Sequence, residues 1–135
     1  MSKTNRPDVV ELRIPFRDVD MNGQMFLASY ISYAESVLAG FWSLRPDVED
    51  EPAYTPAKVS CILHRPLHYH EAVTFTAGVD KIGVRSIGFL IAAEIDDERA
   101  AEVEITWQAR SRDDGSPVAL PEETRDWLYG FLDLD

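Results

Sequence analysis

This chain has almost no cysteine, no long apolar run and few cationic side chains. Its single cysteine, Cys61, excludes an internal disulfide and fits a reducing compartment. No apolar segment approaches the roughly 20 residues that a membrane-spanning helix requires, so we expect no membrane association. Residues 1–7 have no apolar core, which argues against a secretory signal peptide. These absences favour a cytoplasmic protein over a secreted or membrane-embedded one.

Acidic residues dominate the charged positions. The 13 Lys and Arg residues against 24 Asp and Glu residues give a net charge of −11. Such a balance repels a phosphate backbone, so we expect no binding to nucleic acid. A polyanionic ligand therefore needs a local cationic patch. The 135 residues, of which 45% are hydrophobic, suit one folded domain over residues 1–135.

The first third of the chain contains two patterns of apolar residues. Alternation over residues 9–17 predicts a half-buried strand, in which Pro15 indicates an edge position or a bulge. From Leu27 onward apolar residues recur every three or four positions, which predicts a helix of several turns. That helix is expected to end before Pro46, because the residue preceding a proline avoids helical dihedral angles. Small serines on its other face indicate a helix largely wrapped by protein.

Period-two alternation follows the acidic loop 47–52. Its four segments are residues 58–64, 73–80, 87–95 and 101–109. Short turns between the last three segments predict an antiparallel meander, and Pro121 is expected at the first position of a terminal helix. The expected fold class is α+β, with a curved antiparallel sheet wrapped around one long central helix.

The most unusual stretch, residues 18–30, places two carboxylates directly before the predicted helix. Free N–H groups at a helix N-terminus carry partial positive charge and can polarise an acyl carbonyl. A carboxylate beside that carbonyl, Asp18 or Asp20, can attack it or activate a water molecule. The same residues have a second interpretation, in which Asp18 or Asp20 caps the helix or both shape an Asx turn. The residues alone leave both interpretations open.

Four residues of this stretch, Asp18, Asp20, Gly23 and Tyr30, match a known pattern. They resemble the signature D-x-D-x-x-G-H-V-N-N-x-x-Y of the 4-hydroxybenzoyl-CoA thioesterase family of hotdog-fold proteins. In that family the signature precedes an apolar helix that bears a glutamate, which is Glu35 here. Three later stretches resemble further family elements in the same order, at residues 63–67, 81–86 and 115–121. The resemblance covers nearly the whole chain and implies a hotdog fold.

By this resemblance the chain is an acyl-CoA thioesterase. Asp20 corresponds to the catalytic carboxylate, which acts as nucleophile or as general base. The main-chain N–H of Leu27 corresponds to the oxyanion donor, and Gly23 permits close approach of the thioester. Asp18 corresponds to a structural residue. The implied substrate is a coenzyme A thioester, with no metal and no redox cofactor.

Coenzyme A carries phosphates, so the resemblance also implies residues that contact the ligand. These are Phe26, Tyr30, Arg65, Lys81, Arg85 and Ser86. The three cations among them suit phosphate groups, and solvated surface charge explains them equally well. A homodimer or homotetramer is also expected, with sheets joined edge to edge and sites between subunits.

The stretch departs from the family pattern at three positions. Gln24 replaces the usual histidine, and Phe26 and Leu27 replace a polar pair. These changes favour an alternative function, that of a non-catalytic acyl- or CoA-binding hotdog protein. Hotdog hydratases are disfavoured, because no histidine lies near Asp20 in the sequence. A metal site is disfavoured as well, because the histidines lack a fourth ligand at suitable spacing.

Overall fold

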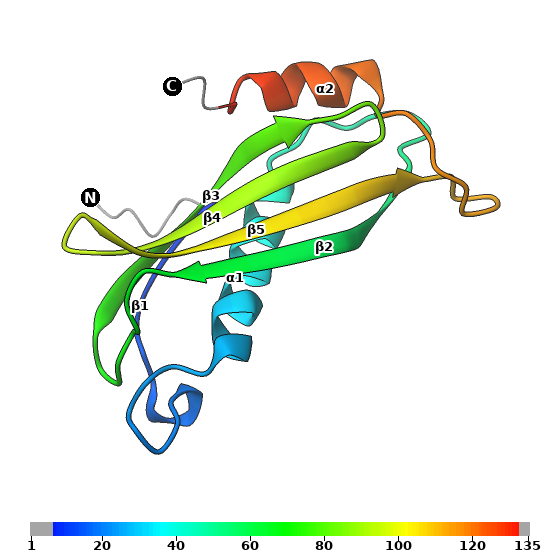
Figure 1. Ribbon diagram of the computed structural model, residues 1–135. Helices are drawn as coiled ribbons and strands as arrows, with labels where there is room; N and C mark the ends of the chain where they lie inside the picture. The colour runs from blue at the N-terminus through cyan, green and yellow to red at the C-terminus, as the bar shows by residue number, and fades with distance from the viewer. Residues whose placement is uncertain (1–6, 133–135) are drawn as a thin grey trace.

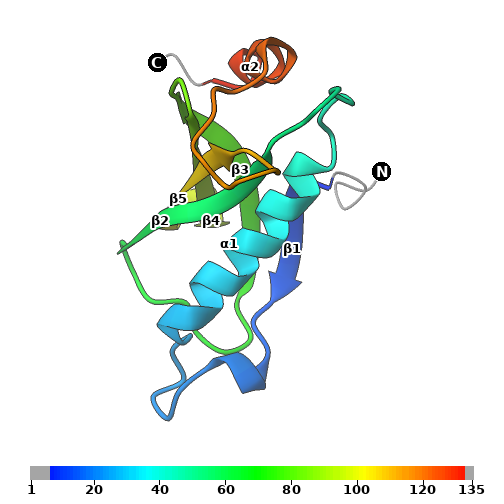
Figure 2. The same ribbon diagram turned by 90° about the vertical axis from the view of Figure 1, so that its right-hand side faces the viewer.

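The computed structural model describes residues 7–132, which form one five-stranded antiparallel sheet and two α-helices. The strands are β1 (Val9–Arg13), β2 (Ala53–Leu63), β3 (Ala72–Ile82), β4 (Ser86–Ile95) and β5 (Glu98–Arg110). The helices are α1 (Leu27–Trp42) and α2 (Glu122–Tyr129), and a short 3₁₀ helix, η2, spans Phe16–Asp18. The strand order is β1-β3-β4-β5-β2. Figures 1 and 2 show α1 crossing one face of the twisted sheet, with α2 at one end.

The core lies between α1 and the three central strands. Alternate side chains of β3, β4 and β5 are buried against the helix, among them Phe75, Phe89 and Ile105. Tyr30, Ala34, Val37, Leu38 and Phe41 form the buried stripe of α1. The period-two and helical patterns therefore meet in one apolar layer, and the predicted α+β class with a central helix is confirmed.

The predicted antiparallel meander is confirmed by the pairing of β3 with β4 and of β4 with β5. Only two residues, Asp96 and Asp97, connect β4 to β5, and both have positive φ, at 52° and 65°. That geometry is typical of a type I′ hairpin turn, which aspartate tolerates better than most side chains. The acidic turn in the sequence thus sets the pairing of β4 with β5.

The strand predicted over residues 9–17 is too long, because β1 ends at Arg13. Ile14 instead exchanges backbone hydrogen bonds with Glu71 and His70, at 3.0 and 2.9 Å, and Pro15 leads into η2. The edge position that Pro15 indicated is confirmed for β1. Proline has no N–H to continue a ladder, so the chain bends before the aspartates.

Other boundaries differ from the prediction as well, and β5 begins at Glu98, three residues before its predicted start at residue 101. Strand β2 begins at Ala53, five residues before the predicted start at Lys58, because a register shift between Pro56 and Lys58 interrupts the alternation. Pro121 is the N-cap of α2 and not its first helical residue. The helix α1 begins at Leu27 and ends at Trp42, ahead of Pro46 as predicted.

Strand β2 forms the second edge of the sheet and is poorly covered in the single chain. Val59, Ile62 and Leu63 keep 48%, 46% and 44% of their surface exposed. The expectation that α1 is largely wrapped by protein is wrong for the single chain, because Ser32 and Ser36 are exposed. Within residues 7–132, neither helix has the length and apolar character needed to cross a membrane.

Candidate active site

A tight turn connects η2 to α1 and carries Asp20. The Asp20 carbonyl accepts the N–H of Gly23 at 2.9 Å, and the Asp20 N–H donates to the Gln24 carbonyl at 2.8 Å. Gly23 has a φ of +78°, a left-handed conformation that other residues adopt only with strain. An isolated antiparallel bridge between Val19 and Met25 closes the turn. Gly23 is therefore required by the backbone, whatever else it contacts.

The Asp20 carboxylate is oriented by this turn. Its Oδ1 atom accepts hydrogen bonds from the N–H groups of Asn22 at 2.8 Å and Gln24 at 3.1 Å, which is an Asx turn. The other oxygen, Oδ2, makes no hydrogen bond within residues 7–132. Asp20 is half-buried. The Asx-turn interpretation thus describes one carboxylate oxygen, and the second remains available for chemistry.

The N-terminus of α1 has no side-chain cap. Its N-cap residue is Phe26, no side chain accepts a hydrogen bond there, and the first turn contains no acidic residue. The Phe26 N–H donates to the Asp18 carbonyl at 2.9 Å, whereas the Leu27 N–H has no partner within the described chain. Neither aspartate caps the helix, so that interpretation is wrong. The arrangement leaves a polarised amide at Leu27 free to receive an oxygen atom.

Asp18 lies on the other side of the turn and contacts α1. The Tyr33 hydroxyl donates a short hydrogen bond to Asp18 Oδ2. Burial of the phenol, together with this bond, raises the pKa of Tyr33 to about 12. Because its carboxylate is fixed by Tyr33 and its carbonyl by Phe26, Asp18 ties η2 to the helix. This geometry fits the structural role expected for Asp18.

The loop between β2 and β3 packs on the start of α1. The Leu67 N–H donates to the Tyr30 hydroxyl at 2.9 Å, and the Met25 N–H donates to the Leu67 carbonyl at 2.7 Å. Tyr30 keeps only 1% of its surface exposed, and this burial raises the pKa of its phenol. In the single chain, Tyr30 therefore anchors the loop, and its ring is not open to a ligand.

Arg65 lies in the same loop and is already paired. Its guanidinium donates to both carboxylate oxygens of Glu71, at 3.1 and 3.0 Å, and to the Pro66 carbonyl at 2.8 Å. The bidentate bond to Arg65 holds the pKa of Glu71 below its usual value. Since Glu71 neutralises its charge, Arg65 stabilises the loop and is a weaker phosphate ligand than its charge alone implies.

The remaining predicted ligand contacts, Lys81, Arg85 and Ser86, lie at the end of β3 and the start of β4. The α2 region holds this turn in place, because Arg125 Nη1 donates to the Gly83 carbonyl at 2.6 Å. Figures 1 and 2 both show α2 and this turn at the opposite end of the molecule from the turn that carries Asp20. One chain alone does not bring these three residues to Asp20.

A groove of about 350 Å³ runs between α1 and β2, lined by Ile31, Glu35, Val59 and Ile105, together with residues 56–58. Sequence reasoning did not single out Ile31. Its four-residue spacing from Leu27 and from Glu35 was the available signal, because that spacing places all three on one helix face. The groove is therefore continuous with the helix face that begins at the unpaired Leu27 amide.

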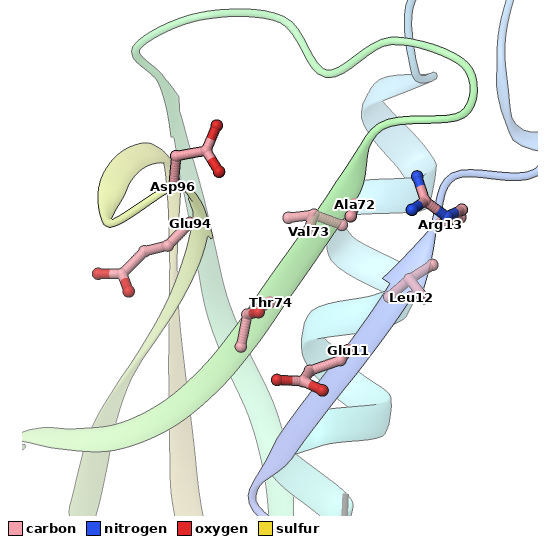
Figure 3. Close-up of a pocket in the computed structure, with 8 residues that line it drawn as sticks. All are labelled: Glu11, Leu12, Arg13, Ala72, Val73, Thr74, Glu94 and Asp96. Atoms are coloured by element: carbon pink, nitrogen blue, oxygen red, sulfur yellow. The ribbon is translucent and has the colours of Figure 1, made fainter. Parts of the chain in front are cut away.

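A larger hollow of about 560 Å³ lies on the opposite face of the sheet. Figure 3 shows the carboxylates of Glu11, Glu94 and Asp96 around it. Like-charge repulsion disfavours an anionic ligand beside these three carboxylates, and Arg13 lines the same hollow at a point apart from them. Among the histidines, His64 pairs with a carboxylate, with Nε2 lying 3.4 Å from Glu102 Oε2. Residues 7–132 contain no group of three or more His, Cys, Asp or Glu residues able to hold a metal.

Cys61 is half-buried on the helix-facing side of β2 and packs against the core. Burial raises the pKa of its thiol, which lowers the thiolate fraction and with it the reactivity. This position fits the small core residue that the strand pattern predicted.

The sequence matches no protein-family model and no curated protein. The structure is similar to that of a predicted thioesterase from Bacillus stearothermophilus, with a TM-score of 0.80 and 14% identity over 94% of this chain and 97% of that one. A thioesterase from Thermus thermophilus, in complex with coenzyme A and zinc, has a TM-score of 0.75 and 23% identity, over 91% of this chain and 92% of that one. A 1,4-dihydroxy-2-naphthoyl-CoA thioesterase from Synechocystis has a TM-score of 0.75 and 11% identity, over 94% of this chain and 96% of that one. The chain has the hotdog fold that these thioesterases share.

Proposed function

We propose that this protein is an acyl-CoA thioesterase that hydrolyses a small-molecule thioester. One observation carries the proposal, which is that a free carboxylate oxygen of Asp20 and the unpaired amide of Leu27 flank the same turn in a fold shared with thioesterases. Two of the similar structures add support, because one contains coenzyme A and another is named for an aromatic acyl-CoA substrate.

In the first route Asp20 is a general base. Its Oδ2 atom removes a proton from water, and the resulting hydroxide attacks the thioester carbonyl. The Leu27 N–H stabilises the negative charge that forms on the carbonyl oxygen. Collapse of the intermediate breaks the carbon–sulfur bond, and the departing thiolate takes the proton back from Asp20. The products are a free acid and coenzyme A.

In the second route Asp20 is the nucleophile. Its Oδ2 atom attacks the carbonyl, and the thiolate leaves to give an acyl–aspartate anhydride and coenzyme A. Water then hydrolyses the anhydride and restores the carboxylate. The same Leu27 amide stabilises both tetrahedral intermediates. Neither route uses a metal or a redox cofactor.

The acyl group fits the groove beside α1. Leu27, Ile31 and Glu35 follow one another at four-residue intervals, and eight residues of helix rise about 12 Å. An acyl chain whose carbonyl meets the Leu27 amide can therefore run along Ile31 toward Glu35. Apolar contacts with Val59 and Ile105 on the sheet side favour a hydrocarbon or aromatic acyl group.

The test is to compare Asp20→Asn with Asp114→Asn in a thiol-release assay across short, long and aromatic acyl-CoAs. Asparagine keeps an oxygen that can accept the two turn hydrogen bonds, so Asp20→Asn removes the charge and preserves the turn. We expect kcat to fall by about 100- to 10,000-fold, the range for a lost general base. Asp114 provides the matched control, because it accepts the same kind of turn hydrogen bond, from Ser116 at 3.0 Å. Full activity in Asp20→Asn contradicts the proposal.

The runner-up function is non-catalytic binding of an acyl group or coenzyme A. It is favoured by the turn itself, because Asp20 Oδ1 is occupied by backbone donors and no polar side chain stands at Phe26 or Leu27 to orient water. The same experiment separates the two functions. A binding protein shows a higher melting temperature with coenzyme A and releases no thiol from any substrate.

We also propose that the chain assembles as a homodimer through the β2 edge. That edge exposes Val59 and Leu63 on the helix-facing side of the sheet and Ile62 on the other side, an apolar strip along the edge beside unpaired backbone groups. A two-fold pairing of β2 with its copy covers this strip and extends both sheets. Light scattering is expected to give twice the chain mass for the wild type or four times for a dimer of dimers, and Val59→Lys is expected to shift it toward the monomer.

A further inference from the structure

An exposed aromatic and cationic patch lies next to the turn that carries Asp20. We define it by Arg13, Phe16, Arg17, Tyr69 and His70, all of which are exposed. Phe16 keeps 76% of its surface exposed and Tyr69 keeps 50%. Exposed apolar side chains scattered singly are ordinary, whereas rings gathered in one patch mark a surface that contacts a ligand or a partner.

The patch is held in a defined geometry. The rings of Phe16 and Tyr69 meet edge to face at 5.7 Å, and those of Tyr69 and His70 lie 5.4 Å apart. Arg13 Nη1 donates to the His70 carbonyl at 3.1 Å. His70 also has a φ of +75°, a conformation that costs a non-glycine residue free energy. These contacts pre-organise the rings, which lowers the entropic cost of binding a flat ligand.

The patch is cationic in a strongly acidic protein. Within residues 7–132, Arg13 and Arg17 form no ion pair with a carboxylate, in contrast to Arg65. Figure 3 shows the Arg13 side chain well apart from the carboxylate of Glu11. Asp18, which directly follows Arg17 in the sequence, accepts a hydrogen bond from Tyr33. Two guanidinium groups beside exposed rings suit a ligand that combines phosphates with an aromatic plane.

The patch is continuous with the candidate active site. The Tyr69 N–H donates to the Gly23 carbonyl at 2.9 Å, and an isolated bridge pairs His68 with Gln24. A ligand that rests on Tyr69 is therefore adjacent to the turn that orients Asp20. The cations expected from the sequence, Lys81 and Arg85, belong to the connection between β3 and β4, which Figure 1 shows at the other end of the molecule from the turn before α1.

The geometry points to a nucleotide subsite, and this inference rests on the proposed thioesterase function. The adenine of coenzyme A stacks on Phe16 and Tyr69, and its phosphates meet the guanidinium groups of Arg13 and Arg17. The pantetheine arm then passes Gly23 toward Leu27. The subsite selects coenzyme A thioesters over carrier-protein thioesters, because only coenzyme A carries the adenine nucleotide.

Calorimetric titration with three probes tests the subsite: coenzyme A, adenosine 3′,5′-bisphosphate and pantetheine. Phe16→Ala is expected to weaken binding of the first two by about ten-fold or more, the usual effect of losing one base-stacking ring. Phe16→Tyr is expected to retain binding. Pantetheine binding is expected to be the same in all variants. Because Phe16 is mostly exposed, these changes should leave the melting temperature unaltered.

Charge is tested with a matched pair of variants. Arg17→Gln and Arg99→Gln each remove one positive charge, and Arg99 lies in a hairpin ion pair with Glu94 and Glu102. We expect Arg17→Gln to weaken binding of the bisphosphate by about ten-fold at low salt and Arg99→Gln to leave it within two-fold, which reflects the loss of one charge-assisted contact. The double variant Lys81→Gln, Arg85→Gln tests whether the phosphates bind instead at the connection between β3 and β4.

Three results overturn the subsite. They are unchanged bisphosphate binding in both Phe16→Ala and Arg17→Gln, loss of binding only in the Lys81 and Arg85 double variant, and conversion of a dimer into a monomer by Phe16→Ala with binding retained. The subsite and the proposed hydrolysis can fail separately. Thiol release that is equally fast from acyl-pantetheine and acyl-CoA supports the enzyme and refutes the subsite. Bisphosphate binding lost in Phe16→Ala, without thiol release by the wild type, supports the subsite and refutes the enzyme.

Discussion

Two turns of this protein have nearly the same local chemistry and very different surroundings. In each, an aspartate Oδ1 accepts the N–H of the residue two positions on, Asn22 for Asp20 and Ser116 for Asp114, at 2.8 and 3.0 Å. In each, a glycine follows with a φ of +78°. Bonds from Ser116 hold the pKa of Asp114 below its usual value. By local geometry alone, either turn qualifies as an orienting device for a carboxylate.

The surroundings separate the two turns. Asp114 is exposed in the connection that follows β5. Asp20 is half-buried between the uncapped start of α1 and the loop that contains Tyr69. An oriented carboxylate becomes a catalytic candidate only where an unpaired donor and a space for a ligand adjoin it. The Asx turn therefore positions Asp20, and the uncapped helix N-terminus beside it is what makes Asp20, unlike Asp114, a catalytic candidate.

After loss of the Asp20 charge, the largest expected effect comes from removing the hydrogen bond between Tyr33 of α1 and Asp18. The Asp114 turn is tied instead to the end of β5, where Arg110 Nη1 donates to the Gly115 carbonyl at 2.9 Å. Tyr33→Phe leaves the Asp18 carboxylate without its donor, and we expect a loss of about 2 kcal/mol in the free energy of unfolding. Because the turn moves relative to α1, kcat should fall while KM for acyl-CoA changes less. Denaturant unfolding and steady-state kinetics measure the two effects.

Alkaline pH gives a second readout of the same bond. The folded state raises the pKa of Tyr33 from 10.0 to about 12, so the folded chain retains a proton that the unfolded chain loses. The corresponding stability is complete below pH 10 and disappears as the pH rises toward 12. In Tyr33→Phe this part of the pH dependence should be missing. Identical alkaline unfolding curves for the two proteins contradict the role given to Tyr33.

Much of the fold follows from patterns within single segments. The alternation at Val73 to Val79 and at Ile87 to Ile95 gives the meander, because a half-buried strand must place every second side chain in the core. The helix start at Leu27 follows from the change of period after Gly23. The start of β2 was not predicted correctly, because the register shift at Pro56 breaks the alternation of its side chains. An edge strand also places fewer apolar side chains in the core, which weakens the pattern.

The candidate site is less visible in the sequence, because its decisive contacts join distant segments. The resemblance of residues 18–30 to the family signature marked Asp20 and the Leu27 amide as candidates. It did not show that Glu71 neutralises Arg65 or that Tyr33 holds Asp18. Each of these pairs forms only after the loop and η2 pack on α1. The sequence therefore nominates candidate groups for reaction, whereas the packed structure decides which charges remain free to bind a ligand.

The smallest expected effect comes from a paired substitution of the two turn glycines. Gly23→Ala and Gly115→Ala each force a side chain into a φ of +78°, and a Cβ at either position meets no atom within 4 Å. The cost is then backbone strain alone, about 1 kcal/mol in the free energy of unfolding for both variants. Only Gly23→Ala should also lower kcat, because relief of that strain rotates the Asp20 carboxylate relative to the Leu27 amide. Equal activity in the two variants, at equal loss of stability, means that the Asp20 turn does not position a reacting group.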